Sequence, residues 1–201
     1  RRGLGAALHL VRVVDPATSL KTADELERHA TESTRGVLLN SPCNPTGAVY
    51  SASELDDVVR LAADRNWWVI SDEIYRRIAY DGPAAGLLSV AKSRERIVVI
   101  DGMAKSFAMT GWRLGYAAGP KEIIHAMGKV QSHTTSHPGS MSQVAGEAAL
   151  REAAEDVARM AAEFARRRDK TMALVAKLPG ISCVPPAGAF YVFPNVSGLF
   201  G

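Results

Sequence analysis

The chain has 201 residues, of which 47% are hydrophobic and 22% charged, and its formal net charge at pH 7 is +3. These values are ordinary for a soluble globular protein with one large domain or slightly more. No run reaches the ~18 consecutive apolar residues of a membrane span, so we expect no membrane segment.

Two further sequence features limit the possible partners and the compartment. The basic run at residues 166–168 lies beside Glu163 and Asp169 in a helical pattern, so we interpret it as a solvated helix face and expect no nucleic-acid partner. Cys43 and Cys183 are the only cysteines and lie far apart in sequence. They do not form a disulfide framework, and this usage fits a reducing, cytoplasmic location.

Short apolar runs rich in β-forming residues predict the strands. Four of them are strong, and a fifth is weaker: residues 8–14, 36–40, 67–71 and 97–101, then 113–119. Three of the strong runs lack alternation between apolar and polar residues. This is typical of strands that are buried on both faces of a mostly parallel sheet.

Helical patterns lie between these runs. The segments 21–30 and 51–65 begin with Thr22 and Ser51, and each has a Glu three residues later. This spacing is the capping box, in which each side chain satisfies a free backbone N–H of the first turn. Alternating strands and helices predict an α/β fold, with a mostly parallel sheet sandwiched by helices.

The pattern becomes helical after about residue 120. Residues 121–130 predict one helix, residues 142–178 predict one long helix or two, and residues 183–196 resemble a strand, a turn and a strand. We therefore divide the chain into a large domain, residues 1–150, and a connecting helix with the start of a small α+β domain, residues 151–201. Both ends look like cuts through a larger protein.

Polar side chains follow the predicted strands at the edge where ligand sites gather in such sheets. They supply an amide, a carboxylate, a phenol, an amine and a guanidinium: Asn44, Asp72, Tyr75, Lys105 and Arg113. Each residue alone has an ordinary explanation as a turn, a helix cap or a surface charge. Their joint occurrence is more informative, and the stretch 103–116 holds two cations with no acidic residue to pair with them.

Three motifs carry a resemblance to a known family. "NSPCNPTGAVY", "SDEIY" and "AKSFAMTGWRLGYAAGP" resemble the class I/II aminotransferases, which are pyridoxal-phosphate enzymes of the aspartate aminotransferase fold. The order and spacing agree, with 28 positions from Asn44 to Asp72, 33 from Asp72 to Lys105 and 8 from Lys105 to Arg113. The resemblance covers nearly the whole chain and includes "GAFYVF" at residues 188–193.

The resemblance implies a role for each of these residues. Lys105 would form the Schiff base with pyridoxal 5′-phosphate and then act as general base between the substrate Cα and the cofactor C4′. Asp72 would keep the pyridine nitrogen protonated, which sustains the electron sink. Asn44 and Tyr75 would donate to the phenolic oxygen. Arg113 would hold the phosphate, for which a guanidinium is well shaped.

The chain departs from the family pattern near the phosphate and near the substrate. Many relatives have Ser one and three residues before the Schiff-base lysine, whereas this chain has Ala104 and Gly102, which predicts fewer phosphate contacts. Dicarboxylate-specific relatives carry an Arg just before a "TTS"-like stretch, whereas this chain has Gln131 and Ser132. Aspartate specificity by that route is therefore not expected. His133 and His137 fit polar loop or interface residues better than substrate ligands.

The resemblance also implies what the complete protein does. We expect an aminotransferase that acts on an amino acid and a 2-oxo acid as a homodimer. We expect residues 1–201 alone to be inactive, because the phosphate loop, the ring-stacking aromatic and the substrate carboxylate clamp lie outside them. The same fold also hosts other reactions such as C–S lysis, and it serves as the ligand sensor of transcription regulators, which need a helix-turn-helix upstream.

Overall fold

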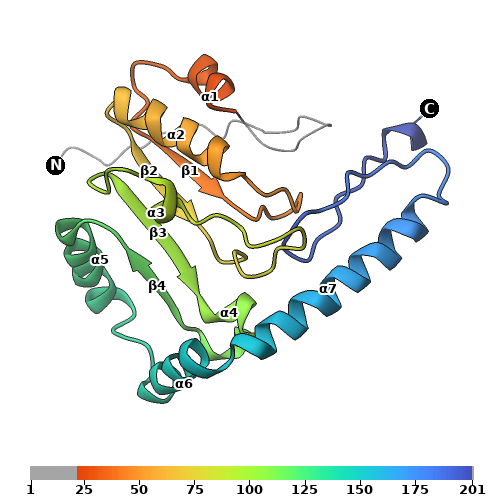
Figure 1. Cartoon of the computed structure of the whole chain (residues 1–201). Coiled ribbons are helices and arrows are strands. Elements are labelled where there is room, and N and C mark those ends of the chain that lie inside the picture. The colour runs from red at the N-terminus through yellow and green to blue at the C-terminus, as the bar shows by residue number, and fades with distance from the viewer. Residues whose placement is uncertain (1–21, 201) are drawn as a thin grey trace.

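The computed structural model describes residues 22–200, and the predicted strand at residues 8–14 lies outside this range. The described residues form a four-stranded sheet with the order β1-β2-β3-β4 (Figure 1). Its strands are β1 (Gly36–Asn40), β2 (Trp68–Asp72), β3 (Ile97–Gly102) and β4 (Gly115–Ala118). The first three are parallel and β4 is antiparallel to β3. The prediction of a mostly parallel α/β sheet is confirmed.

Both predicted capping boxes are present. Helix α1 (Ala23–His29) begins after Thr22, and helix α2 (Ala52–Asp64) begins after Ser51. In each case the hydroxyl oxygen accepts the N–H of the glutamate three residues later, at 3.3 Å and 3.2 Å. Such a cap contributes about 1 kcal/mol to helix stability, because it satisfies backbone donors that have no partner within the helix.

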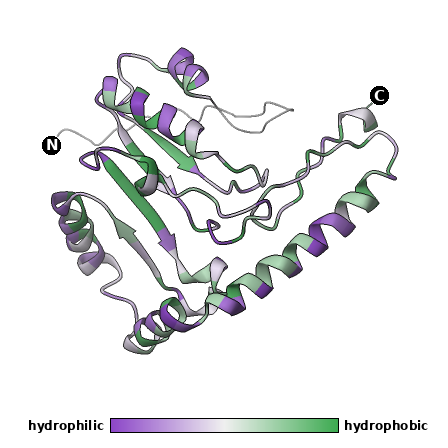
Figure 2. Ribbon diagram, in the orientation of Figure 1, coloured by the Kyte–Doolittle hydropathy of each residue, from purple (hydrophilic) through white to green (hydrophobic). Residues whose placement is uncertain are grey.

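The hydrophobic core lies between the sheet and helices α2 and α3 (Leu87–Val90). Leu55 and Val58 of α2 are buried in this core. They belong to the same cluster as one buried residue from each parallel strand: Leu39 of β1, Val69 of β2 and Val99 of β3. Figure 2 shows these strands as mostly hydrophobic, with a hydrophilic end on β3. This packing fixes the position of the strands. Their polar carboxyl ends are not part of the core and are available for a binding or catalytic site.

The opposite face of the sheet differs from the prediction. Leu38, Ile70 and Ile100 lie on this face and are 60%, 37% and 39% exposed. The prediction that the strands are buried on both faces is therefore wrong for these positions in residues 22–200. The physical reason is that α2 and α3 pack on the other face.

The second half of the chain is helical up to residue 175. It contains α5 (Lys121–Thr134), α6 (Ser140–Glu152) and α7 (Ala154–Val175), so the segment predicted as one long helix or two forms two (Figure 1). Arg166 and Arg167 of α7 both pair with Glu163 at 2.8 Å. These bonds lower the pKa of Glu163 to about 2, as expected for an ion-paired helix face. Of the helices described, none is long and apolar enough to cross a membrane.

The segment after α7 runs back toward the sheet, then turns away from it again and ends in a short 3-10 helix, Ser197–Leu199 (Figure 1). The predicted pair of strands in residues 183–196 does not form. Instead, one isolated antiparallel bridge joins Ser182 to Asn195, and another joins Ala79 to Gly188. Prolines at positions 185, 186 and 194 have no N–H to donate to a ladder, which explains the difference.

Candidate active site

The candidate active site lies at the carboxyl edge of the sheet. Asn40, the last residue of β1, pairs with Asp72, the last residue of β2, and Asp72 pairs with Ile100 of β3. The short helix α4 (Met103–Ser106) follows β3 directly and carries Lys105. Parallel strands end on the same side, so the three loops that follow them share one edge, as the sequence predicts.

Asn40 holds the loop after β1 against the end of β2. Its Nδ2 donates to the carbonyl oxygen of Asp72 at 3.2 Å, and its Oδ1 accepts the N–H of Asn44 at 2.7 Å. The carboxylate of Asp72 accepts the N–H of Ile74 at 3.1 Å through Oδ1. Sequence reasoning missed Asn40, although its position as the polar end of an apolar strand was a usable signal.

Tyr75 is buried, and its hydroxyl lies 2.5 Å from the hydroxyl of Tyr191. The Nδ2 of Asn44 donates to the same Tyr191 oxygen at 3.3 Å. Burial raises the pKa of Tyr75 well above its usual value, so its hydroxyl stays protonated. Two predicted site residues are thus linked by a third residue that was not predicted.

Lys105 lies beside this cluster. Its Nζ is 6.0 Å from the centre of the Tyr75 ring and 5.7 Å from that of Phe190. The neighbouring Ser106 is buried, and its hydroxyl donates to the carbonyl of Ile74 at 3.3 Å. This bond ties the helix that carries Lys105 to the turn that carries Tyr75.

Arg113 follows the 3-10 helix Thr110–Trp112 and adopts a left-handed backbone conformation, with φ 52° and ψ 44°. A non-glycine residue in this region costs roughly 1–2 kcal/mol, and such strain clusters at ligand sites. Its guanidinium is exposed and donates to the carbonyl of Thr110 at 3.3 Å. Within residues 22–200, no carboxylate forms an ion pair with Lys105 or Arg113.

Gly102 explains one departure from the family pattern. A Cβ at this position would lie 2.9 Å from Gly115 Cα and 2.9 Å from the carbonyl oxygen of Leu114. Gly102 and Gly115 are direct partners across β3 and β4, so the two backbones approach closely here. A serine does not fit at Gly102 unless this strand pair moves apart.

Buried acidic groups lie beneath the site, and sequence reasoning did not identify them. Glu73 accepts the N–H of Leu87 at 2.7 Å and lies 3.1 Å from Nε of Arg76. Burial raises the pKa of the Glu73 carboxyl, although these donors oppose the effect. Asp101 accepts the hydroxyl of Tyr116 at 2.9 Å. These contacts join the residue after Asp72 to helix α3, and β3 to β4.

The other polar residues singled out by the sequence lie elsewhere. Gln131, Ser132 and His133 occupy the last turns of α5 and are exposed. His137 follows in a loop, and its Nδ1 lies 2.9 Å from the carbonyl oxygen of Pro138. The structure shows no hydrogen bond between these residues and the five predicted site residues. Cys43 lies in the Asn44 loop, where its backbone N–H donates to Ala48 at 2.8 Å.

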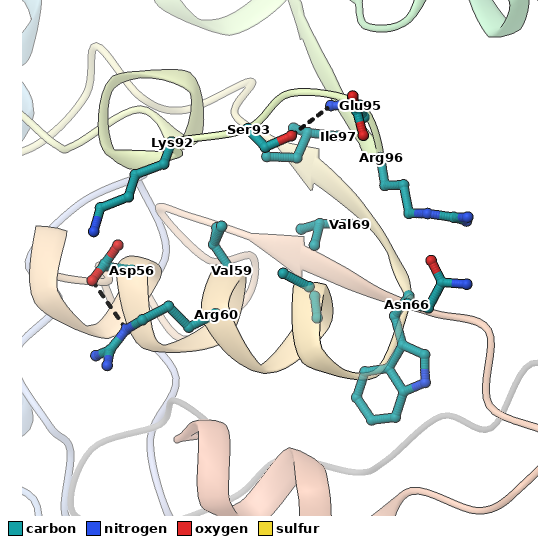
Figure 3. A pocket seen from close by; sticks show the side chains of 13 residues that line it. Asp56, Val59, Arg60, Asn66, Val69, Lys92, Ser93, Glu95, Arg96 and Ile97 are labelled. Atoms are coloured by element: carbon teal, nitrogen blue, oxygen red, sulfur yellow. Dashed lines mark hydrogen bonds and ion pairs between the residues drawn. The ribbon is translucent and has the colours of Figure 1, made fainter.

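A pocket of about 310 Å³ lies at the other end of the strands, between α2 and residues 92–97 (Figure 3). Trp67, Val69 and Ile97 form part of its apolar wall, and Arg60 and Lys92 lie at its rim. Trp67, Val69 and Ile97 lie at or near the first residues of β2 and β3, whereas Asp72 ends β2 and Lys105 follows β3. The pocket is therefore separate from the candidate active site. Among residues 22–200 there is also no group of three His, Cys, Asp or Glu side chains that could hold a metal ion.

The fold and the site together define an α/β domain whose strand ends present two cations, a carboxylate, a phenol and an amide. The family described as aminotransferase class I and II matches residues 2–199. The chain belongs to this family.

Named relatives agree with this assignment. An aspartate aminotransferase of Bacillus sp. (strain YM-2) is 41% identical over 180 residues, which are 88% of this chain and 45% of that protein. The crystal structure of the Rhizobium meliloti aspartate aminotransferase has a TM-score of 0.86 at 39% identity, over 91% of this chain and 46% of that one. An aromatic aminotransferase from Pyrococcus horikoshii has a TM-score of 0.84 at 37% identity, over 88% and 48%. The chain thus spans about half the length of the relatives it matches.

Membership of the family implies pyridoxal 5′-phosphate as cofactor, and the donor set fits this group. An amine suits an aldehyde, a guanidinium suits a phosphate, and a carboxylate suits a protonated pyridine nitrogen. The cations Lys105 and Arg113 have no acidic partner in the described residues, so an anionic ligand would supply one. The Tyr75 hydroxyl, which stays protonated, can donate to a phenolic oxygen.

Proposed function

We propose that the complete protein is a pyridoxal-phosphate-dependent aminotransferase that moves an amino group between an amino acid and a 2-oxo acid. One observation carries the proposal. Among residues 22–200, Lys105 and Arg113 have no acidic partner, and they lie at the strand edge that also presents Asp72, Tyr75 and Asn44. Lys105 is half-buried, and a partly desolvated charge without a counter-charge is costly, whereas the exposed guanidinium of Arg113 is accessible to an anionic ligand.

Each residue has a separate part in holding the cofactor. Lys105 would bond its aldehyde carbon, Asp72 would accept from its pyridine nitrogen, Asn44 and Tyr75 would donate to its phenolic oxygen, and Arg113 would bind its phosphate. When bound, the protonated pyridine ring supplies a sink for the electron pair left at the substrate Cα. Because Gly102 and Ala104 carry no hydroxyl, the phosphate depends more strongly on Arg113 than in relatives with two serines.

Lys105 also moves the proton in this proposal. With the cofactor and the substrate bound, the free Nζ of Lys105 would act as the general base for the proton on the substrate Cα. The short helix α4 carries Lys105 directly after β3. Ser106 stabilises this placement through its hydrogen bond to Ile74 at 3.3 Å.

We propose a two-part organisation for the chain, with the cofactor-binding part in residues 1–150 and the connecting helix and start of a small domain in residues 151–201. The long helix α7, which extends away from the sheet in Figure 1, supports this division. We also propose a cytoplasmic homodimer in which residues 131–138 lie at or near the interface. The exposed apolar side chains of Met141 and Val144 on α6 fit such an interface.

The test uses the full-length protein, loaded with pyridoxal phosphate and supplied with an amino acid and each of a panel of 2-oxo acids. We expect exchange of the amino group with at least one pair. We also expect the visible absorbance of the bound cofactor to be lost in Lys105→Ala. A protein that binds the cofactor and exchanges no amino group with any 2-oxo acid would contradict the proposal. In that case release of a thiol from a cysteine derivative would identify a C–S lyase.

A further inference from the structure

Tyr191 is placed to act on the cofactor through Tyr75. Its hydroxyl lies 2.5 Å from the Tyr75 hydroxyl, and its oxygen accepts from Asn44 Nδ2 at 3.3 Å. We infer that Tyr191 is a positioning residue that orients the Tyr75 hydroxyl toward the phenolic oxygen of the cofactor and strengthens its donation. The inference rests on the proposed function and adds to it a residue from the far end of the chain.

The direction of the hydrogen bonds follows from the donors available. An amide NH2 can only donate, so the Tyr191 oxygen accepts from Asn44. Tyr75 has a single proton, and if that proton points to the cofactor then its oxygen must accept the proton of Tyr191. The result is a one-way chain from Asn44 to Tyr191 to Tyr75 to the cofactor. In such chains each bond polarises the next, so the last donor is stronger than an isolated phenol.

The segment that carries Tyr191 is firmly attached to the loops of the site. The carbonyl oxygen of Gly47 accepts the N–H groups of Ala187 and Gly188, both at 2.9 Å. The N–H of Ala189 donates to the carbonyl of Ile78 at 2.8 Å. These bonds connect the segment to the Asn44 loop and to the turn after Tyr75. They place the Tyr191 hydroxyl by backbone contacts rather than by a mobile loop.

Aromatic packing completes the arrangement. The rings of Tyr75 and Tyr191 are 5.6 Å apart at 80°, and those of Tyr75 and Phe190 are 5.2 Å apart at 84°. Edge-to-face contacts of this kind fix ring orientation. The charged groups that face Tyr75 are Asp72, at the end of β2, and Lys105, on α4. Neither replaces the hydrogen bond that Tyr191 offers.

The test is a pH titration of the visible absorbance of the full-length protein with bound pyridoxal phosphate. A donor to the phenolic oxygen withdraws negative charge from it, and that charge otherwise helps to hold a proton on the neighbouring Schiff-base nitrogen. Removing the donor should therefore move the midpoint of the absorbance change to higher pH. We expect Tyr75→Phe to give the larger rise and Tyr191→Phe a rise of roughly 0.2–0.5 pH unit.

Two further variants separate positioning from a general structural role. In the Tyr75→Phe background, adding Tyr191→Phe should produce no further rise, because the effect of Tyr191 passes through Tyr75. Tyr80→Phe is the matched control, since the Tyr80 hydroxyl donates to the carbonyl of Ala189 and anchors the same segment without joining the chain. We expect Tyr80→Phe to leave the midpoint where it is in the wild type.

The outcomes are distinct. Three results would overturn the role of Tyr191 and leave the proposed function intact. They are an unchanged midpoint in Tyr191→Phe, an additive rise of the midpoint in the double variant, and an equal rise in Tyr80→Phe. A wild-type protein with no visible absorbance from bound cofactor at any pH would overturn the proposed function and this inference with it.

Discussion

Tyr116 donates its hydroxyl hydrogen bond to Oδ2 of Asp101, 2.9 Å away, and the two residues are also direct partners across the antiparallel strands β3 and β4. Asp101 and Tyr116 flank the segment 102–115, which carries both cations of the site, Lys105 and Arg113. Asp101 is four residues before Lys105, and Tyr116 is three residues after Arg113. The bond therefore fixes the ends of the segment that carries Lys105 and Arg113, which we propose to hold the aldehyde carbon and the phosphate of the cofactor.

We predict that Tyr116→Phe lowers the free energy of unfolding by about 1–3 kcal/mol, because it leaves one oxygen of the buried Asp101 carboxylate without a donor. Urea unfolding at pH 7 measures this change. The double variant Tyr116→Phe/Asp101→Asn should lose less than the sum of the single changes, since both remove one bond. Full additivity would contradict the pairing.

The same pair predicts a pH dependence. Burial, then the charge of Asp101, raises the pKa of Tyr116 to about 12 in the folded protein. A raised pKa means that the stabilisation is present below the ordinary tyrosine value, about 10, and is lost as the pH rises through 12. The difference in unfolding free energy between wild type and Tyr116→Phe should therefore shrink between pH 10 and 12. A constant difference across that range would argue against the shift.

Gly102→Ser restores a residue that many relatives carry, and we predict that it destabilises this protein. The new Cβ would lie 2.9 Å from Gly115 Cα, and overpacking of this kind costs about 1–3 kcal/mol. Gly111→Ser is the matched control in the same connection, because a Cβ there meets no atom within 4 Å. Equal urea midpoints for the two variants would show that the strands have room at Gly102.

Gly47→Ala should weaken both stability and cofactor binding. Gly47 has φ +72°, and a Cβ there would lie 2.2 Å from Pro186 Cβ and 2.9 Å from the carbonyl oxygen of Gly188. The clash would separate the Asn44 loop from the segment that carries Tyr191. Gly82→Ala isolates the cost of positive φ, because Gly82 has φ +119° and open space around it. Pyridoxal-phosphate titration of the full-length variants should show weaker binding for Gly47→Ala alone.

Glu73→Ala should cost about 3 kcal/mol of unfolding free energy, and Glu73→Gln less. The carboxylate accepts from Leu87 N–H and from the Ser71 hydroxyl, at 2.7 Å and 3.2 Å, and alanine leaves both without an acceptor. Glutamine keeps one acceptor oxygen.

The same residue predicts a pH dependence. Because burial raises the pKa of Glu73, the stabilising contribution of this residue is present below about pH 4.5 and is lost as the pH rises. Glu73→Gln should therefore reduce the change in unfolding free energy between pH 4 and 7. A variant whose unfolding free energy changes with pH as much as that of the wild type would contradict this.

The local features of the fold were predictable from the sequence. The capping boxes at Thr22 and Ser51 and the strand Gly36–Asn40 depend on residues close together in the chain, and all are present. The strand ends predicted one shared edge for Asn44, Asp72 and Lys105 because parallel strands leave little choice of geometry.

Long-range pairings were not predictable in the same way. Tyr75 and Tyr191 are separated by 116 positions, and no local pattern marks them as partners. The motif "GAFYVF" was recognised, yet its β-rich composition predicted a strand there, and the neighbouring prolines prevent one. The exposed face at Leu38 could not be foreseen either, because its apolar run looks the same whether one face is covered or two.

The central claim is that Lys105 holds pyridoxal phosphate. To test this directly, the full-length protein is loaded with the cofactor and its Schiff base is reduced with borohydride. The modified peptide is then mapped by mass spectrometry. We predict a stable cofactor adduct on Lys105, with none at comparable yield on another lysine and none in Lys105→Ala. An adduct on a different lysine, with Lys105 unmodified, would contradict the assignment of Lys105.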